Sequence, residues 1–241
     1  QVFDQKKISS LTGNVAIAHT RYATAGSDDR GDLQPMVTGS PLGVGMAHNG
    51  NILNYHSLAQ ELREKYRYQL LSTNDLEVIM RYWCHFFMEG YGQNDKQFSF
   101  ERAKKTVKKL VETIQGGYSV ISIVAGEGLM AFRDPQGIRP LVIGRRLIAG
   151  QPGKYTYCIA SETVALNFLG FEFMRDCRPG ELIFIDFDGN FHTEELPDGS
   201  ARIPKAHCMF EWVYFSAAES MIENQSVYRV RLNLGERLAL K

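Results

Sequence analysis

The hydrophobic pattern of this 241-residue chain changes character at Gly116-Gly117. Before that point, apolar residues recur at helical spacing in three stretches that begin near Asn54, Ser72 and Ser99. After it come short apolar runs separated by turn residues, including Asp188-Gly189, a pair typical of a tight hairpin. Helices followed by antiparallel hairpins, without regular alternation of strand and helix, predict an α+β fold built in layers.

Several local features of this fold are also predicted. We expect buried strands at 15–19 and 41–46, and an aromatic, strand-like segment at 209–215. Ser72 and Asp75 have a spacing similar to that of a capping box, so a helix is expected to begin there. Asn-Gly is a turn dipeptide, and Asn49-Gly50 is therefore expected at a strand-to-helix corner.

Composition and charge exclude some classes of function. Lys plus Arg and Asp plus Glu both number 27, so a formal net charge of zero gives no support for a nucleic-acid or membrane partner. No apolar run approaches the roughly 20 residues that a membrane-spanning helix needs. The first seven residues are polar, unlike a signal peptide. Four cysteines without CxxC spacing suit reduced thiols, which favours a cytoplasmic location.

Three loops carry side chains that together suit an amino acid. Arg21, with the Thr24 hydroxyl nearby, offers a guanidinium that binds carboxylates bidentately, although most arginines at strand ends are solvated. Asp75 either binds an ammonium group or only complements the dipole of its helix. The Asn49 amide and the Gly50 N–H are two donors that suit a developing oxyanion, unless the pair is only a turn.

These loops closely resemble the class II glutamine amidotransferase domain, an N-terminal-nucleophile hydrolase. The matching stretches are 19–24, 47–51 and 72–77. The resemblance implies a four-layer αββα sandwich and hydrolysis of glutamine. It also implies that Asn49 and Gly50 form the oxyanion hole, and that the substrate is bound by Arg21, Tyr22, Thr24 and Asp75.

Later stretches are similar to the amidophosphoribosyltransferase family, at 132–141, 160–163, 179–181 and 208–216. This resemblance implies that ammonia from glutamine displaces pyrophosphate from phosphoribosyl pyrophosphate and gives 5-phosphoribosylamine, the first step of purine synthesis. It divides the chain into a glutaminase domain, 1–206, and a linker with the first elements of a phosphoribosyltransferase domain, 207–241. A homo-oligomer is expected.

The sequence departs from that family at both ends. In the family a processed N-terminal cysteine is the nucleophile, whereas this sequence begins with Gln1, and most of the phosphoribosyltransferase motifs are missing. We therefore expect a fragment truncated at both ends that does not hydrolyse glutamine alone. Magnesium is expected only at the missing phosphoribosyltransferase site.

An iron–sulfur cluster, found in some members, is not favoured for this chain. Cys208 matches one ligand position, but the other three cysteines match none, and such clusters generally need four cysteine ligands. We therefore expect no metal here.

Two other functions remain open. One is the glutaminase domain of another class II amidotransferase, such as glucosamine-6-phosphate synthase, against which the 208–216 stretch argues. The other is a non-catalytic binding protein on the same fold.

Overall fold

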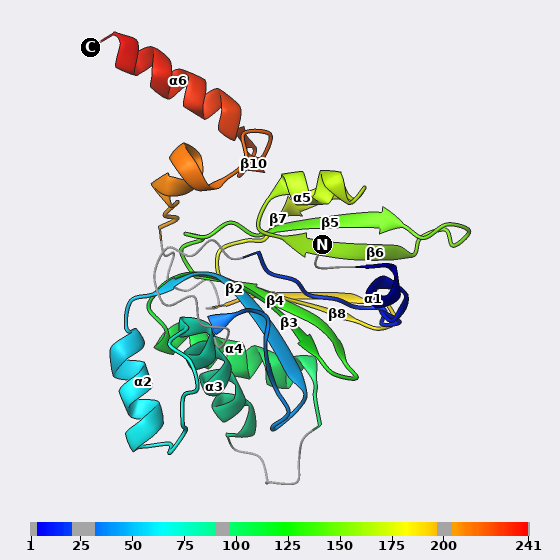
Figure 1. The fold of residues 1–241 in the computed structure, drawn as a ribbon, viewed down its shortest axis with the longest axis vertical. Helices are drawn as coiled ribbons and strands as arrows, with labels where there is room; N and C mark the ends of the chain where they lie inside the picture. The colour runs from blue at the N-terminus through cyan, green and yellow to red at the C-terminus, as the bar shows by residue number, and fades with distance from the viewer. Residues whose placement is uncertain (1–3, 21–31, 90–96, 197–203, 241) are drawn as a thin grey trace.

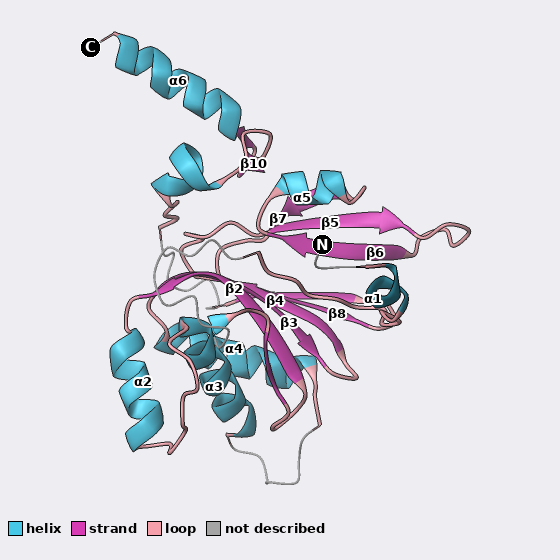
Figure 2. Ribbon diagram, in the orientation of Figure 1, coloured by secondary structure: helices cyan, strands magenta, loops and turns pink. Residues whose placement is uncertain are grey.

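The computed structural model describes residues 4–20, 32–89, 97–196 and 204–240 of the chain. A six-stranded antiparallel sheet lies at its centre, in the strand order β1-β2-β3-β4-β8-β9 (Figures 1 and 2). Strands β2 and β3 pair along their whole length, from Val44 opposite Val124 to Ile52 opposite Gly116. The strands of this sheet are β1 (Met36–Thr38), β2 (Val44–Ile52), β3 (Gly116–Val124), β4 (Gly128–Arg133), β8 (Glu181–Asp186) and β9 (Phe191–Glu195).

One face of this sheet is covered by three helices: α2 (Tyr55–Glu64), α3 (Asp75–Met88) and α4 (Phe100–Thr113). The apolar stripes predicted from the sequence face the sheet. Leu62, Trp83 and Leu110, one from each helix, are fully buried in the same core as Met46 and Phe132 of the sheet. Burying a large apolar side chain contributes about 1.5–3 kcal/mol, so this core holds the helices on the sheet.

The other face of the six-stranded sheet packs against a smaller antiparallel sheet in the order β6-β5-β7. Ile143 and Ile159 from the small sheet meet Ile183 of the large one in a second buried core. A short helix, α5, covers the outside of the small sheet, where Leu166 packs closely on Gly144. The predicted αββα layering is therefore confirmed. These elements are β5 (Val142–Leu147), β6 (Tyr155–Ala160), α5 (Thr163–Phe168) and β7 (Glu172–Asp176).

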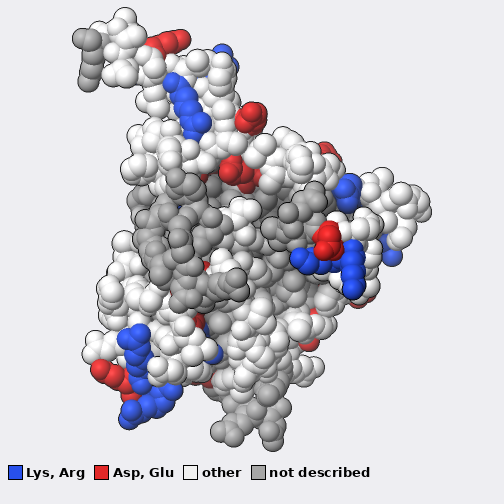
Figure 3. Space-filling model, viewed as in Figure 1, with Lys and Arg blue, Asp and Glu red and all other residues white. Residues whose placement is uncertain are grey.

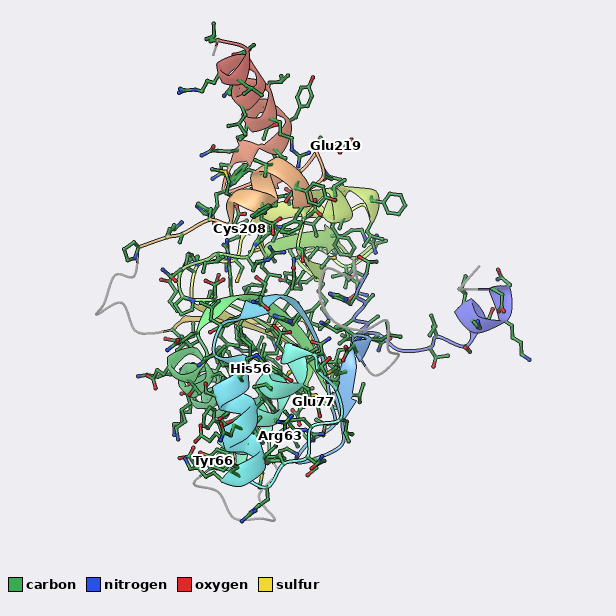
Figure 4. The ribbon with its side chains drawn as sticks, turned by 60° about the vertical axis from the view of Figure 1, so that its left-hand side comes forward. His56, Arg63, Tyr66, Glu77, Cys208 and Glu219 are labelled. Carbon is green, nitrogen blue, oxygen red and sulfur yellow. The ribbon has the colours of Figure 1, made fainter. Side chains whose placement is uncertain are left out.

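The C-terminal segment leaves this sandwich and ends in a helix that points away from it (Figure 1). The segment contains the short hairpin β10 (Met221–Ile222) and β11 (Gln225–Ser226), followed by α6 (Val227–Ala239). Glu162, just before α5, holds the segment through the Ala217 N–H (2.7 Å) and the Ser220 hydroxyl (2.9 Å). In Figure 4, Cys208 lies where the segment joins the sandwich.

The strand predicted at 209–215 is wrong, because residues Glu211–Phe215 form one turn of π-helix. The N–H of Ser216 donates to the carbonyl of Glu211, five residues back, at 3.2 Å. Aromatic residues favour strands only where neighbouring strands cover them. Here Phe210 and Tyr214 are exposed, and no strand among the described residues pairs with the segment.

Two strand predictions near the N-terminus also need correction. After α1 (Gln5–Ser9), residues 15–19 alternate between half-buried and exposed but form no strand, because none of the described strands pairs with them. Strand β2 begins at Val44 and continues through Asn49-Gly50 to Ile52. The pair is therefore not the predicted corner, which lies just beyond the strand at residues 53–54.

The surface charges agree with a net charge of zero. On the face shown in Figure 3, basic and acidic residues are interspersed, without a broad area of one sign. Among the described helices, none is both long enough and apolar enough to cross a membrane.

Candidate active site

The residues predicted to bind substrate are only partly within the described chain. Asn49 and Gly50 lie in β2, and Asp75 is the first residue of α3. Arg21, Tyr22 and Thr24 lie outside the described residues, so their place in one pocket with the others stays a prediction. Two cavities, of about 270 and 290 Å³, lie elsewhere and are lined by none of Asn49, Gly50 and Asp75.

The backbone N–H of Gly50 points to the outer edge of β2. Antiparallel strands exchange backbone hydrogen bonds at alternate residues, so every second N–H points away from the partner strand. Gly50 lies opposite Tyr118 of β3, whose N–H and C=O both bond to Asp134 on the other side (3.3 and 2.8 Å). By this alternation, the N–H groups of His48, Gly50 and Ile52 share the edge that faces away from β3.

On this edge, the backbone N–H of Gly50 lies between two N–H groups that already donate hydrogen bonds. His48 N donates to Gln34 Oε1 at 2.7 Å, and Ile52 N donates to Asp75 Oδ2 at 3.1 Å. Strand β1 pairs with β2 only as far as Met46. Within the part of the chain that the structure describes, the Gly50 N–H therefore has no acceptor. A backbone donor fixed in a strand suits a negatively charged ligand oxygen.

Asp75 is held against this edge by the loop before α3. Buried Asp32 accepts hydrogen bonds from Thr73 N (3.1 Å) and Thr73 Oγ1 (3.0 Å). The helix cap is Asn74, which accepts from Leu76 N at 3.0 Å, so the predicted capping role of Ser72 is wrong.

Ser72 instead donates to Glu77, whose buried carboxylate accepts hydrogen bonds from N–H groups of the loop. Figure 4 shows Glu77, a residue of α3, beside α2, the helix that carries His56 and Arg63. The Asp75 side chain, 18% exposed, keeps access to a ligand.

His48 is a buried neutral imidazole beside Asp75. Its Nδ1 lies 3.5 Å from Asp75 Oδ1, and only 4% of the residue is exposed. Burial lowers the pKa of His48, and this outweighs the attraction of Asp75, which acts in the opposite direction. The positive fields of His19 and Arg139 lower the pKa further.

The lowered pKa makes stability depend on pH. The unfolded chain binds a proton at His48 below about pH 6.5, whereas the folded chain resists protonation until a lower pH. Stability from this residue is therefore complete above about pH 6.5 and falls as the pH approaches the folded pKa. We expect His48→Gln to lose less Tm between pH 7.5 and 5.5 than the unmodified chain.

Thermal unfolding at both pH values, with His56→Gln as a control on the exposed surface of α2, measures this difference. An equal loss of Tm in the His48 variant and the unmodified chain would contradict the assignment.

The Asn49 side chain is held by two residues that sequence reasoning did not assign. Arg139 Nη2 donates to Asn49 Oδ1 at 2.5 Å, and Asn49 Nδ2 donates to Ser161 Oγ at 3.1 Å. Both partners fall in stretches that resemble the amidophosphoribosyltransferase family, at 132–141 and 160–163. The sequence otherwise suggested only that Ser161 caps the following helix, whereas the structure gives Glu162 as the N-cap, and neither signal pointed to a contact with Asn49.

Arg139 ends a loop that is organised by the buried carboxylate of Asp134. This carboxylate accepts from the backbone N–H groups of Gln136 (3.0 Å), Ile138 (3.0 Å) and Arg139 (3.2 Å). Burial raises the pKa of Asp134, although these hydrogen bonds and the neighbouring Arg133 favour its charged form. The loop places the Arg139 side chain between β2 and the C-terminal segment.

Burial makes three of the described thiols, Cys84, Cys158 and Cys177, poor nucleophiles. Burial raises the pKa of Cys84 to about 12, and it also raises the pKa values of Cys158 and Cys177. Nucleophilic cysteines need the opposite shift. Cys84 and Cys177 lie in different hydrophobic cores, and no group of three or more metal-binding side chains is found within the described ranges. The absence of a metal in this chain stays a prediction.

Comparison with known proteins identifies the family. The family model described as glutamine amidotransferase domain matches residues 19–167. The amidophosphoribosyltransferases of Pasteurella multocida (strain Pm70) and Escherichia coli (strain K12) are 39% and 38% identical to the chain over its whole length. The matches span 46% of each relative, so the chain spans about half their length.

Two solved structures are similar as well. Glutamine phosphoribosylpyrophosphate amidotransferase from B. subtilis, complexed with ADP and GMP, gives a TM-score of 0.72 at 29% identity over 92% of this chain and 43% of that one. A structure described as the allosteric regulatory enzyme of purine biosynthesis gives 0.73 at 30% identity, with the same coverage. Because the family model covers more than half of the residues, this chain belongs to the glutamine amidotransferase domain family.

Proposed function

We propose that this chain is the glutaminase part of an amidophosphoribosyltransferase. Glutamine is hydrolysed to glutamate, and the ammonia displaces pyrophosphate from phosphoribosyl pyrophosphate to give 5-phosphoribosylamine, the first step of purine synthesis. The names of the relatives and of the solved structures support this reaction. The observation that carries the proposal is the pair of adjacent donors on β2, namely the Asn49 amide and the Gly50 N–H, which has no acceptor among the described residues.

These donors fit the charge that develops when an amide is cleaved. The nucleophile attacks the side-chain carbonyl carbon of glutamine, and the electron pair of the C=O bond moves to oxygen. An amide N–H and a backbone N–H that point at this oxygen stabilise it. Collapse of the intermediate expels ammonia, and water then releases glutamate from the acyl-enzyme.

The proposal takes the nucleophile from the family resemblance, as a processed N-terminal cysteine with its own α-amino group as base. An α-amino group has a pKa near neutral, which suits this role. Cys84, Cys158 and Cys177 do not suit it, since burial raises the pKa of each thiol.

Substrate binding completes the proposal. Arg21 and Thr24 bind the α-carboxylate of glutamine, with Tyr22 beside them, and Asp75 binds the α-ammonium group. The position of Asp75 supports this, because its carboxylate is fixed on the β2 edge close to the Gly50 N–H.

We expect Asp75→Asn to raise KM for glutamine and to leave the fold intact. Asparagine keeps an oxygen that accepts the Ile52 N–H but loses the charge that attracts an ammonium group. Hydrogen bonds to charged groups contribute about 1.5–3 kcal/mol, which corresponds to a KM increase of about 10–150-fold. Steady-state kinetics of glutamate release measures it, and an unchanged KM would leave Asp75 with only a structural role.

The segment 207–241 is proposed to begin the phosphoribosyltransferase domain. Many apolar residues of this segment are exposed, up to 89% at Leu240, which supports contact with further protein, either that domain or another subunit of a homo-oligomer. The exposed residues include Phe210, Tyr214, Tyr228, Leu232, Leu234, Leu238 and Leu240.

The reaction is tested with the protein expressed from its complete coding sequence. Glutamine labelled with ¹⁵N in the amide is incubated with phosphoribosyl pyrophosphate, and glutamate and pyrophosphate are measured together. Equal yields, with the label in the amine of the product, support the proposal. Glutamate release that responds to fructose 6-phosphate and gives no pyrophosphate would instead favour a glucosamine-6-phosphate synthase.

A further inference from the structure

We propose that Arg139 and Ser161 are positioning residues that lock the Asn49 amide in the orientation required of an oxyanion donor. The inference rests on the proposed function of Asn49. It concerns two side chains that contact Asn49 from distant parts of the sequence, 90 and 112 residues away.

The chemistry of the two partners fixes which way the amide points. A guanidinium only donates hydrogen bonds, so the Asn49 atom 2.5 Å from Arg139 Nη2 is the oxygen. The nitrogen of the amide then faces Ser161 Oγ at 3.1 Å. If the amide were rotated by 180°, its NH₂ group would face the guanidinium, donor against donor, and the contact would be repulsive.

This orientation leaves one N–H of the amide for a ligand. The Asn49 nitrogen carries two hydrogens, and Ser161 accepts one of them. The second has no acceptor among the described residues. Without these two contacts, the amide could also turn its oxygen toward the developing oxyanion, and the two oxygens would repel each other. The contacts therefore favour catalysis as well as fixing the side chain.

Other residues hold both the backbone and the side chain of Arg139 in place. Its backbone carbonyl accepts from Ser119 Oγ (3.1 Å) and Arg133 Nε (2.7 Å). Its guanidinium pairs with Glu211 Oε1 at 2.8 Å and lies 5.2 Å from the centre of the Phe215 ring. The Arg139 and Glu211 side chains are 15% and 6% exposed, so little water competes with the pair. Because Glu211 lies in the π-helical turn, the C-terminal segment contributes to holding the donor.

The test compares Asn49→Ala, Arg139→Gln and the double variant in the protein expressed from its complete coding sequence. A small misplacement of a catalytic group costs up to about 10²-fold, so we expect Arg139→Gln to lower kcat for glutamate release by about 10–100-fold. KM for glutamine should stay within about threefold of the unmodified protein, because the oriented amide stabilises the charged intermediate and not bound glutamine. The double variant should lose no more than Asn49→Ala alone, because Arg139 acts through Asn49.

Matched variants separate positioning from folding. Arg178→Gln removes an exposed arginine that pairs with Glu195 on the surface, and it should keep full activity. Synthesis of phosphoribosylamine from added ammonia bypasses glutamine and should survive in every folded variant. Arg139→Lys, which keeps the charge but lacks the fork that reaches both Asn49 and Glu211, should recover part of kcat. Ser161→Ala gives a second, smaller change in the same contact.

The outcomes distinguish this inference from the proposed function. If Asn49→Ala keeps full glutaminase activity, the oxyanion role of Asn49 fails, and the proposed function loses the observation that carries it. If Asn49→Ala loses activity while Arg139→Gln and Ser161→Ala both keep it, the positioning inference alone is overturned. Losses that multiply in the Asn49/Arg139 double variant would also overturn it, because they would mean that Arg139 acts independently of Asn49.

Discussion

Asn49→Ala is expected to lower kcat for glutamine hydrolysis by about 10²–10³, the cost of removing one oxyanion-hole donor. The variant removes only the side-chain amide, and the backbone of residue 49 keeps its place in β2. KM for glutamine should change little, because the donor acts on the charged intermediate. Glutamate release at saturating glutamine measures the effect.

Asn51→Ala provides the matched control for this variant. Asn51 lies two residues further along β2 and is exposed, so the same truncation there should leave kcat unchanged. Ammonia-dependent synthesis should be equal in both variants and in the unmodified protein. If Asn49→Ala matched Asn51→Ala in kcat, Asn49 would be a structural strand residue.

Gly50→Ala is expected to destabilise the fold by about 2–6 kcal/mol. Gly50 has φ of 153°, and a Cβ there would lie 2.1 Å from the Gly117 carbonyl oxygen and 2.7 Å from Tyr118 Cα. These are backbone atoms of the adjacent strand, so β2 and β3 must separate to make room. Backbone strain costs about 1–3 kcal/mol and overpacking costs another 1–3 kcal/mol.

Gly45→Ala in the same strand is the control for this prediction. A Cβ at Gly45 would lie 3.5 Å from Ile17 Cδ1 and 3.8 Å from Val37 Cγ2, which are ordinary contacts. Urea unfolding of both variants compares the two sites. Stabilities within about 0.5 kcal/mol of each other would show that the close approach of Gly50 and Gly117 does not exist in the protein.

The elements that follow local sequence signals were predicted well. The apolar stripe that begins near Ser99 predicted α4, and in the structure Ser99 caps this helix by accepting a hydrogen bond from the Arg102 N–H. The β8–β9 hairpin was also predicted, because Asp188-Gly189 favours a tight turn. The prediction of a corner at Asn49-Gly50 was wrong because it used only the turn preference of this dipeptide. Only the pairing with β3, which runs from Val44 to Ile52, keeps the strand continuous through it.

Only those residues of the candidate site that lie in a family motif were predicted from the sequence. Asn49, Gly50 and Asp75 were singled out from short motifs, and the structure brings Asp75 to the β2 edge that holds the Gly50 N–H. Arg139 and Ser161 were not assigned a role, since their contacts with Asn49 arise from the packing of the two sheets and leave no local pattern. The role of Glu211 was not predicted either, because its segment was predicted to be a strand and is a π-helical turn.

A crystal structure of the protein expressed from its complete coding sequence, with its nucleophile alkylated by a diazoketone analogue of glutamine, tests the central claim most directly. The adduct keeps a carbonyl oxygen at the position of the reacting amide. The account predicts that this oxygen lies about 2.7–3.1 Å from both Asn49 Nδ2 and Gly50 N. A carbonyl oxygen directed to solvent, or bound by donors other than these two, would contradict it.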